Sequence, residues 1–294
     1  MKVRIKKLIL TVYSKLKSLF KKQPQKVMAN VVQLAENELL SGKVAVITGG
    51  TSGIGFSIAD AMLRANASAV CITGRTEERC RNAVEKLMNM GTDRGGRVFY
   101  EVMDVRDVKS FDKHLIQNKI GHLRIDILCN NAGVQGATFG SANEDDFDNV
   151  MDTNYKGAFF LSQIFAHYMI DNKIEGNILN IASSSSLRPT NSAYSLSKAC
   201  MKELTAGMGK FLIPYGIVVN GLAPGPTATP LMNKDSTSSI EHPSNPTGRY
   251  ALPEEIANMA VVLTSGMGRM IVGSIIYMTG GAGNITFDDS KYKF

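Results

Sequence analysis

From residue 43 onward, short apolar segments alternate with longer amphipathic ones, and this alternation restricts the fold more than any other feature of the chain. The apolar segments predict strands at 44–48, 69–73, 97–102, 125–130, 177–181, 217–222 and 275–279. The segments between them predict helices at 54–66, 77–90, 108–118, 144–171, 193–212 and 254–263. Strands that alternate with helices are typical of a parallel sheet whose two faces are covered by helices. The sequence therefore predicts an α/β fold, a doubly wound parallel sheet of about seven strands.

Residues 1–26 differ from the rest of the chain in charge and periodicity. They hold nine Lys and Arg residues and no acidic residue, although the net charge of the whole chain is only +7. The remainder is therefore slightly acidic, which argues against nucleic acid as a partner. Apolar residues recur in this segment at helical spacing, so it predicts a basic amphipathic helix. Two roles stay open: peripheral contact of residues 1–22 with an anionic membrane surface, or docking on the protein itself or on another subunit.

The composition is that of an ordinary globular protein, with 44% hydrophobic and 20% charged residues. The four cysteines form no CxxC pair, and the four histidines form no metal-ligand motif. These patterns predict free thiols, a cytoplasmic location and no metal site. The longest apolar run of the first 26 residues, 8–10, is too short for a signal peptide or a membrane span. Any membrane contact would therefore be peripheral, at the inner membrane surface.

A glycine-rich turn, Thr-Gly-Gly-Thr-Ser-Gly-Ile-Gly at 48–55, joins the first predicted strand to the first predicted helix. Glycines allow the backbone to approach a phosphate closely, and a helix start supplies free N–H groups and the positive end of its dipole. A plain strand-to-helix turn is the alternative, but the strand before it and the helix after it favour a dinucleotide. The candidate cofactor-binding residues of this turn are Gly49, Thr51, Ser52, Gly53, Ile54 and Gly55.

The end of the second predicted strand indicates which dinucleotide is bound. NAD sites place an acidic residue here to bind the ribose 2′-hydroxyl, whereas an arginine suits a 2′-phosphate. This chain has Arg75 at that place, followed by Thr76. The sequence therefore favours NADP(H) over NAD(H), with Arg75 as the candidate ligand. Glu77 or Glu78 turned inward would instead favour NAD(H).

Tyr194 and Lys198 are four residues apart in a predicted helix, so they lie on one face of it. A free phenol has a pKa near 10 and is a poor base at neutral pH. A neighbouring ammonium group, together with an oxidised nicotinamide, would lower that pKa toward the working range. The pair therefore predicts a proton donor beside a bound dinucleotide.

With these motifs in this order, the chain resembles the short-chain dehydrogenase/reductase family, in its single-domain branch with TGxxxGxG and YxxxK motifs. The resemblance covers residues 42–284, which follow a connector at 27–41 and precede a C-terminal tail at 285–294. Further matching residues are Asp104, Val105, Asn131, Ala132, Gly133, Asn154, Ser183, Pro224, Gly225, Thr227 and Thr229. The resemblance implies a single-domain Rossmann fold and an enzyme that interconverts a secondary alcohol and a ketone by hydride transfer.

The resemblance also implies roles for these residues. Tyr194 would be the general acid/base, Ser183 would bind the substrate oxygen, and Lys198 would hold the nicotinamide ribose. Tyr194 and Lys198 would both be cofactor-binding residues as well. Asn154 would position a water beside Lys198 and complete the catalytic set. The other cofactor-binding residues would be Asp104 and Val105 near the adenine, Asn131, Ala132 and Gly133 near the adenosine ribose, and Pro224, Gly225, Thr227 and Thr229 toward the nicotinamide.

The chain departs from the family pattern in two places. Ser183 stands about two residues closer to the tyrosine than is usual in the family, which leaves Ser184 as a second candidate. Many NADP-dependent members also carry a basic residue where this chain has Ser52, so the case for a 2′-phosphate depends on Arg75 alone.

The implied partners are a small ketone or alcohol substrate and further copies of the chain. The substrate classes favoured by the family are a 3-oxoacyl thioester and a sugar or polyol. The irregular segment 232–250 follows the sixth predicted strand and predicts a polar lid. The family implies a homotetramer or dimer built through the helices at 144–171 and 193–212. The alternative function is a non-catalytic NADP-binding scaffold or redox sensor tethered by its basic N-terminal helix.

Overall fold

The computed structural model describes residues 37–90, 97–111, 124–235, 237–283 and 285–286. In these residues, seven parallel strands form one sheet in the order β3-β2-β1-β4-β5-β6-β7. The strands are β1 (Val44–Ile47), β2 (Ala69–Gly74), β3 (Arg97–Val102), β4 (Ile127–Asn130), β5 (Asn177–Ile181), β6 (Val218–Pro224) and β7 (Ile275–Met278). The predicted doubly wound parallel sheet of about seven strands is confirmed.

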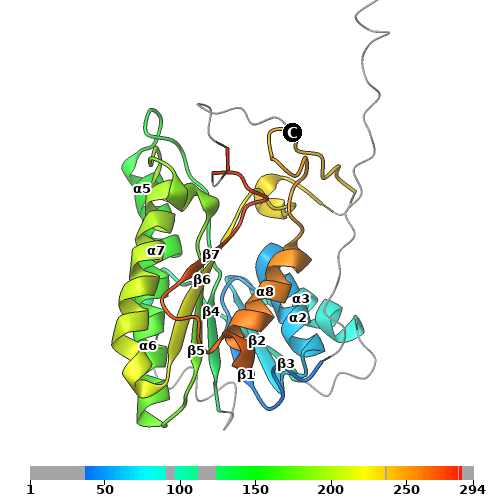
Figure 1. The fold of residues 1–294 in the computed structure, drawn as a ribbon, viewed down its shortest axis with the longest axis vertical. Coiled ribbons are helices and arrows are strands. Elements are labelled where there is room, and N and C mark those ends of the chain that lie inside the picture. The colour runs from blue at the N-terminus through cyan, green and yellow to red at the C-terminus, as the bar shows by residue number, and fades with distance from the viewer. Residues whose placement is uncertain (1–36, 91–96, 112–123, 236, 284, 287–294) are drawn as a thin grey trace, which may run out of the picture.

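Helices cover both faces of the sheet (Figure 1). One face carries α2 (Gly53–Arg64), α3 (Glu77–Asn89) and α8 (Pro253–Thr264), and the other carries α5 (Glu144–Met151), α6 (Gly157–Asp171) and α7 (Ala193–Leu212). The helix predicted at 144–171 is not continuous, because a π-helical turn, Asp152–Lys156, separates α5 from α6. Of the helix predicted at 108–118, the described part holds a short 3₁₀ turn, Val108–Ser110. Residues 112–118 lie outside the described residues.

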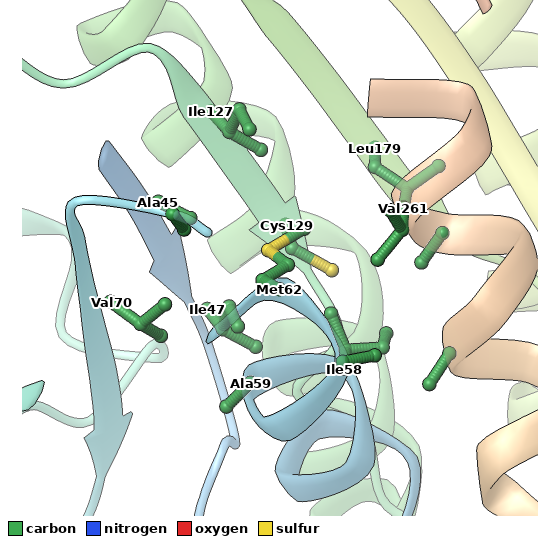
Figure 2. Packing of buried hydrophobic residues seen from close by; sticks show 14 of the residues in the cluster. Ala45, Ile47, Ile58, Ala59, Met62, Val70, Ile127, Cys129, Leu179 and Val261 are labelled. Atoms are coloured by element: carbon green, nitrogen blue, oxygen red, sulfur yellow. The ribbon is translucent and has the colours of Figure 1, made fainter. Parts of the chain in front are cut away.

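The core on the α2 and α8 side shows why the sequence folds this way. Alternate residues of β1, Ala45 and Ile47, point at α2, where Ile58 and Met62 are fully buried one turn apart (Figure 2). Val261 of α8 joins the same cluster. Burial of each such side chain contributes about 1.5–3 kcal/mol. This apolar packing fixes the start of α2, and therefore the glycine turn before it.

The chain order places a topological switch point between β1 and β4. From β1 the chain moves outward to β2 and β3, then returns across the sheet to β4 and continues the other way. Loops leaving two neighbouring strands in opposite directions open a crevice at their carboxyl ends, where ligands bind in doubly wound sheets.

The predicted N-terminal helix at 1–26 lies outside the described residues. The described chain starts at Asn37, and Leu40, which the sequence places in the connector, is fully buried against the core of α2. Within the described ranges, no helix combines the length and apolar content that a membrane span needs.

Candidate active site

A cleft of about 870 Å³ lies at the carboxyl ends of the strands, where the switch point predicts it. The segments that follow β1 to β6 all contribute to its lining. The predicted site residues that line it are Gly49, Thr51, Ser52, Gly53, Ile54, Arg75, Asp104, Val105, Asn131, Ala132, Gly133, Ser183, Tyr194, Lys198, Pro224, Gly225, Thr227 and Thr229. Two predicted residues, Gly55 and Asn154, do not line the cleft.

The glycine turn forms the floor at one end of the cleft. Gly49 and Gly53 have φ values of 63° and 56°, in the left-handed region that side chains disfavour. A Cβ at Gly49 would lie 2.9 Å from the Cα of Ala132, so only glycine allows the turn to lie this close to the segment after β4. The side chain of Ser52 makes no capping bond to α2, so the start of this helix is available to an anion.

Gly55 serves packing rather than ligand contact. A Cβ there would collide with Nδ2 of Asn131. That amide donates hydrogen bonds to the carbonyl oxygens of Thr48 and Gly49, at 2.9 and 3.1 Å. The missing side chain thus lets the segment after β4 hold the glycine turn in place.

The start of α3 brings two guanidinium groups to the cleft. Arg75 and Arg79 are exposed and line it together with Thr76 and Glu78. The sequence analysis did not predict Arg79 as a site residue. Its position three residues after Thr76, in the first turn of α3, could have indicated that the two lie on the same side of the helix. Glu77 does not line the cleft, and its Oε1 accepts a hydrogen bond of 3.4 Å from the Tyr100 hydroxyl. Of the two acidic residues left open by the sequence, only Glu78 faces this space.

Asp104 lies in the cleft already paired with an arginine. The Arg106 guanidinium donates to both carboxylate oxygens of Asp104, with a shortest distance of 2.6 Å, and also to Oδ1 of Asn149 at 3.0 Å. The hydrogen bonds from Arg106 lower the pKa of Asp104, and the positive charge of Arg75 adds to the effect. Asp104 therefore presents a carboxylate of fixed orientation at this wall.

Ser183 and Tyr194 form the reactive end of the cleft. Burial raises the pKa of the Tyr194 phenol, and a hydrogen bond with the Ser183 side chain lowers it by a smaller amount. The Ser183 hydroxyl oxygen also accepts a hydrogen bond from the Ser185 backbone N–H at 3.2 Å, which fixes its rotamer. Ser184 is buried and does not line the cleft, so the geometry favours Ser183 of the two serines.

The ammonium group of Lys198 is buried, with little access to water. Its side chain is 4% exposed, and Nζ donates a hydrogen bond of 2.7 Å to the carbonyl oxygen of Ile181. Nζ lies 5.9 Å from the ring centroid of Tyr194. Burial lowers the pKa of Lys198 to about 8, so the group changes charge close to neutral pH.

Asn154 lies behind this end of the cleft, in the π-helical turn Asp152–Lys156. Its side chain is 1% exposed and binds the backbone of Val134 twice. Oδ1 accepts from the Val134 N–H at 2.8 Å, and Nδ2 donates to the Val134 carbonyl at 2.9 Å. A Cβ on Gly133 would lie 3.4 Å from Asn154 Oδ1 and 3.6 Å from Lys198 Nζ. Asn154 is thus adjacent to the ammonium group without facing the cleft.

Three residues that the sequence did not indicate, Thr153, Gln135 and Leu231, also line the cleft. Nε2 of Gln135 donates a hydrogen bond of 3.4 Å to the thioether of Met232, which lines the cleft as well. Of the predicted lid at 232–250, Met232 is the residue that reaches the cleft among those described. The described part of the chain brings no three His, Cys, Asp or Glu side chains into a metal-binding group.

A sheet of this order, with a glycine turn at its switch point, defines the class of Rossmann-type enzymes. Residues 43–239 match the family model of short chain dehydrogenases. The chain belongs to the short-chain dehydrogenase/reductase family, and it is an oxidoreductase that acts on hydroxyl and keto groups.

Known relatives are similar over almost their whole length. A 3α-hydroxysteroid dehydrogenase of Mediterraneibacter gnavus is 31% identical over 83% of this chain and 98% of its own. A 3-oxoacyl-acyl-carrier-protein reductase of Thermotoga maritima is 33% identical over 82% of this chain and 98% of its own. Among solved structures, a short-chain type dehydrogenase/reductase from Mycobacterium marinum has 30% identity and a TM-score of 0.74, over 82% of this chain and 96% of that one.

Proposed function

We propose that this protein is an NADP(H)-dependent oxidoreductase that interconverts a secondary alcohol and a ketone. The observation that carries the proposal is the placement of Ser183, Tyr194 and Lys198 in the same cleft as the glycine turn and Arg75. The first three supply proton chemistry, and the last two supply binding for phosphate groups. One cleft thus offers both halves of a hydride-transfer reaction.

The residues of the cleft fit a dinucleotide. Gly49 leaves a cradle that a Cβ would fill, and the uncapped start of α2 suits a pyrophosphate. Asp104 and Val105 would hold the adenine, Asn131 and Ala132 its ribose, and Thr229, which lines the same cleft as Tyr194, would hold the nicotinamide amide. When bound, the reduced cofactor supplies the hydride.

The side chains of this protein would then bind the substrate oxygen and transfer the proton. Ser183 binds the substrate carbonyl oxygen and stabilises the negative charge that develops on it. The Tyr194 hydroxyl gives its proton to that oxygen during reduction and takes it back during oxidation. Lys198 holds the ribose hydroxyls and, as an ammonium group, favours the ionised phenol. Asn154 completes the relay by holding a water beside Lys198.

Replacement of Arg75 by glutamine is expected to reduce the preference for NADPH over NADH by a factor of about 10–100, because a charge-assisted hydrogen bond contributes about 1.5–3 kcal/mol. Arg75 is exposed and lines the cleft next to Thr76 and Arg79. The measurement is kcat/KM for each cofactor with one ketone.

The matched control is Arg81→Gln, because Arg81 is an exposed arginine of α3, the helix that follows Arg75, and it does not line the cleft. It should leave the ratio of the two kcat/KM values unchanged. An unchanged ratio in Arg75→Gln as well would contradict a 2′-phosphate site at Arg75.

The substrate would enter between Gln135, Met232 and Tyr194. The Gln135 amide donates to a thioether, which is a weak acceptor, so a polar group of the substrate would be a better partner. The relatives are named for steroid, gluconate and 3-oxoacyl substrates. We favour a 3-oxoacyl thioester or a keto sugar for this chain.

The test is NADPH consumption against acyl-thioester, sugar and simple cyclic ketones, with NADH in parallel. Turnover of any of these ketones would support the proposal and indicate the substrate class. Tight NADPH binding with no turnover of any ketone would favour a non-catalytic scaffold instead.

The same proposal includes a homo-oligomer, a tetramer or a dimer. Among the described residues of α5, α6 and α7, five large apolar side chains are exposed: Phe147, Phe159, Phe160, Leu196 and Phe211. Exposed large apolar side chains on neighbouring helices are typical of an interaction surface. Light scattering should give a mass of two or four chains, and Phe159→Glu should reduce it. A monomer in the wild type would contradict the assignment.

A further inference from the structure

We propose that Ser197 is a positioning residue of the active site, which fixes the Asn154 amide to the turn of α7 that carries Tyr194 and Lys198. Its side chain is completely buried and does not line the cleft, so it touches neither substrate nor cofactor. The inference rests on the proposed function, because it concerns the proton chemistry of the same site.

The Asn154 side chain depends on Ser197 for one of its hydrogen bonds. Nδ2 carries two protons, of which one goes to the Val134 carbonyl at 2.9 Å and the other to Ser197 Oγ at 3.1 Å. Asn154 is 1% exposed, so bulk solvent does not reach Nδ2 to replace a lost acceptor. Without the serine oxygen, one amide proton would stay buried and unpaired, which is costly.

Rotation of the amide would not resolve this. Oδ1 accepts from the Val134 N–H at 2.8 Å, so a flipped amide would set a donor against a donor. The Asn154 side chain therefore has one favourable orientation, and Ser197 and Val134 define it together.

Ser197 also forms a hydrogen bond within α7, the helix that carries Tyr194 and Lys198. Its hydroxyl donates a hydrogen bond of 2.7 Å to the carbonyl oxygen of Tyr194, three residues earlier in α7. Tyr194 and Lys198 flank this hydroxyl in the sequence, and Lys198 Nζ lies near Asn154 across Gly133. One oxygen thus connects the π-helical turn to the helical turn that bears the phenol and the ammonium group.

Thr205 provides a matched control on the same helix. Its hydroxyl is also fully buried, accepts a hydrogen bond of 2.9 Å from the Asn180 amide, and donates one of 2.8 Å to the Met201 carbonyl. The two hydroxyls have the same types of partner, but Thr205 lies two turns away from Lys198. Loss of either should lower stability, whereas only Ser197 should affect the reaction.

The experiment compares Ser197→Ala, Thr205→Val and Ser197→Thr in the full-length protein. We expect Ser197→Ala to lower kcat about tenfold, to shift the pH profile of kcat, and to leave the Kd for NADPH within about twofold of wild type. Thr205→Val should lower Tm to a similar extent while its kcat stays within about twofold. Ser197→Thr keeps an oxygen that can bond the same carbonyl, so it should recover most of the lost rate.

Hydrogen–deuterium exchange tests the role of Ser197 without any need for turnover, so it does not depend on the proposed function. Ser197→Ala should speed exchange in 132–135 and 152–156, and Thr205→Val should not. Equal exchange in these segments for both variants, or equal kcat losses in both, would overturn the positioning role. A wild type that turns over no ketone would instead count against the proposed function, and the exchange difference would still decide whether Ser197 fixes Asn154.

Discussion

Replacement of Tyr194 by phenylalanine is expected to lower kcat by a factor of about 10²–10⁴, the usual contribution of a positioned general acid. Tyr194 is half-buried at the cleft, and phenylalanine keeps its ring while removing the hydroxyl that would give its proton to the substrate oxygen. The Kd for NADPH should stay within about threefold, because phenylalanine keeps the ring and the other cofactor-binding residues are unchanged. Steady-state kinetics and a fluorescence titration with NADPH give the two values.

The adjacent serines test whether the loss is specific to this arrangement. Ser183→Ala should lower kcat, since Ser183 bonds to the Tyr194 hydroxyl and lines the cleft. Ser184→Ala should not, because Ser184 is buried away from the cleft. A Tyr194→Phe enzyme with wild-type turnover would exclude Tyr194 as the proton donor.

The sheet was predictable because each strand is a short apolar run between polar turns. Six of the seven predicted starts agree with the structure to within one residue, and the exception is β4. Ile125 is buried and apolar, yet the ladder to β1 and β5 begins at Ile127. β6 extends to Pro224 because Pro224 pairs with Met278 of β7. Strand ends are thus decided by the neighbouring strand, which is remote in sequence.

The location of the cleft was predictable where its residues follow strands in fixed order, since all carboxyl ends of parallel strands meet at one edge. The glycine turn and Arg75 are of this kind, whereas Tyr194 and Lys198 were predicted from their spacing in a helix. The π-helical turn around Asn154 was not, and the hydrogen bonds that Asn154 makes there go to the backbone of Val134, 20 residues upstream. The contact of Asn154 with Ser197 spans 43 residues, and no local pattern encodes it.

Lys198 carries a cost in stability that the sequence cannot reveal. Burial lowers its pKa from 10.5 to about 8, a difference worth about 3 kcal/mol. Below pH 8 both the folded and the unfolded chain hold the proton, and the folded chain bears the buried charge. Between pH 8 and 10.5 the folded chain releases the proton while the unfolded chain keeps it. The free energy of unfolding of the wild type should therefore rise with pH across this range.

Lys198→Met is accordingly expected to remove activity and to raise stability at once. Methionine fills a similar volume without a charge, so the free energy of unfolding at pH 7 should increase by about 2 kcal/mol, after allowance for the lost bond to Ile181. The gain should disappear as the pH approaches 10.5. Unlike Tyr194→Phe, the variant should also lose affinity for NADPH, and kcat/KM should fall by at least about 10².

Urea unfolding of both proteins at a series of pH values measures this effect. Lys202→Met is the control, because Lys202 is a half-exposed lysine of the same helix, and it should change neither the pH dependence nor the activity. A Lys198→Met variant with the stability and pH dependence of the wild type would mean that no buried charge is carried at this position. An active site that gains stability when its lysine is removed would be one where the charge is retained for the reaction and not for the fold.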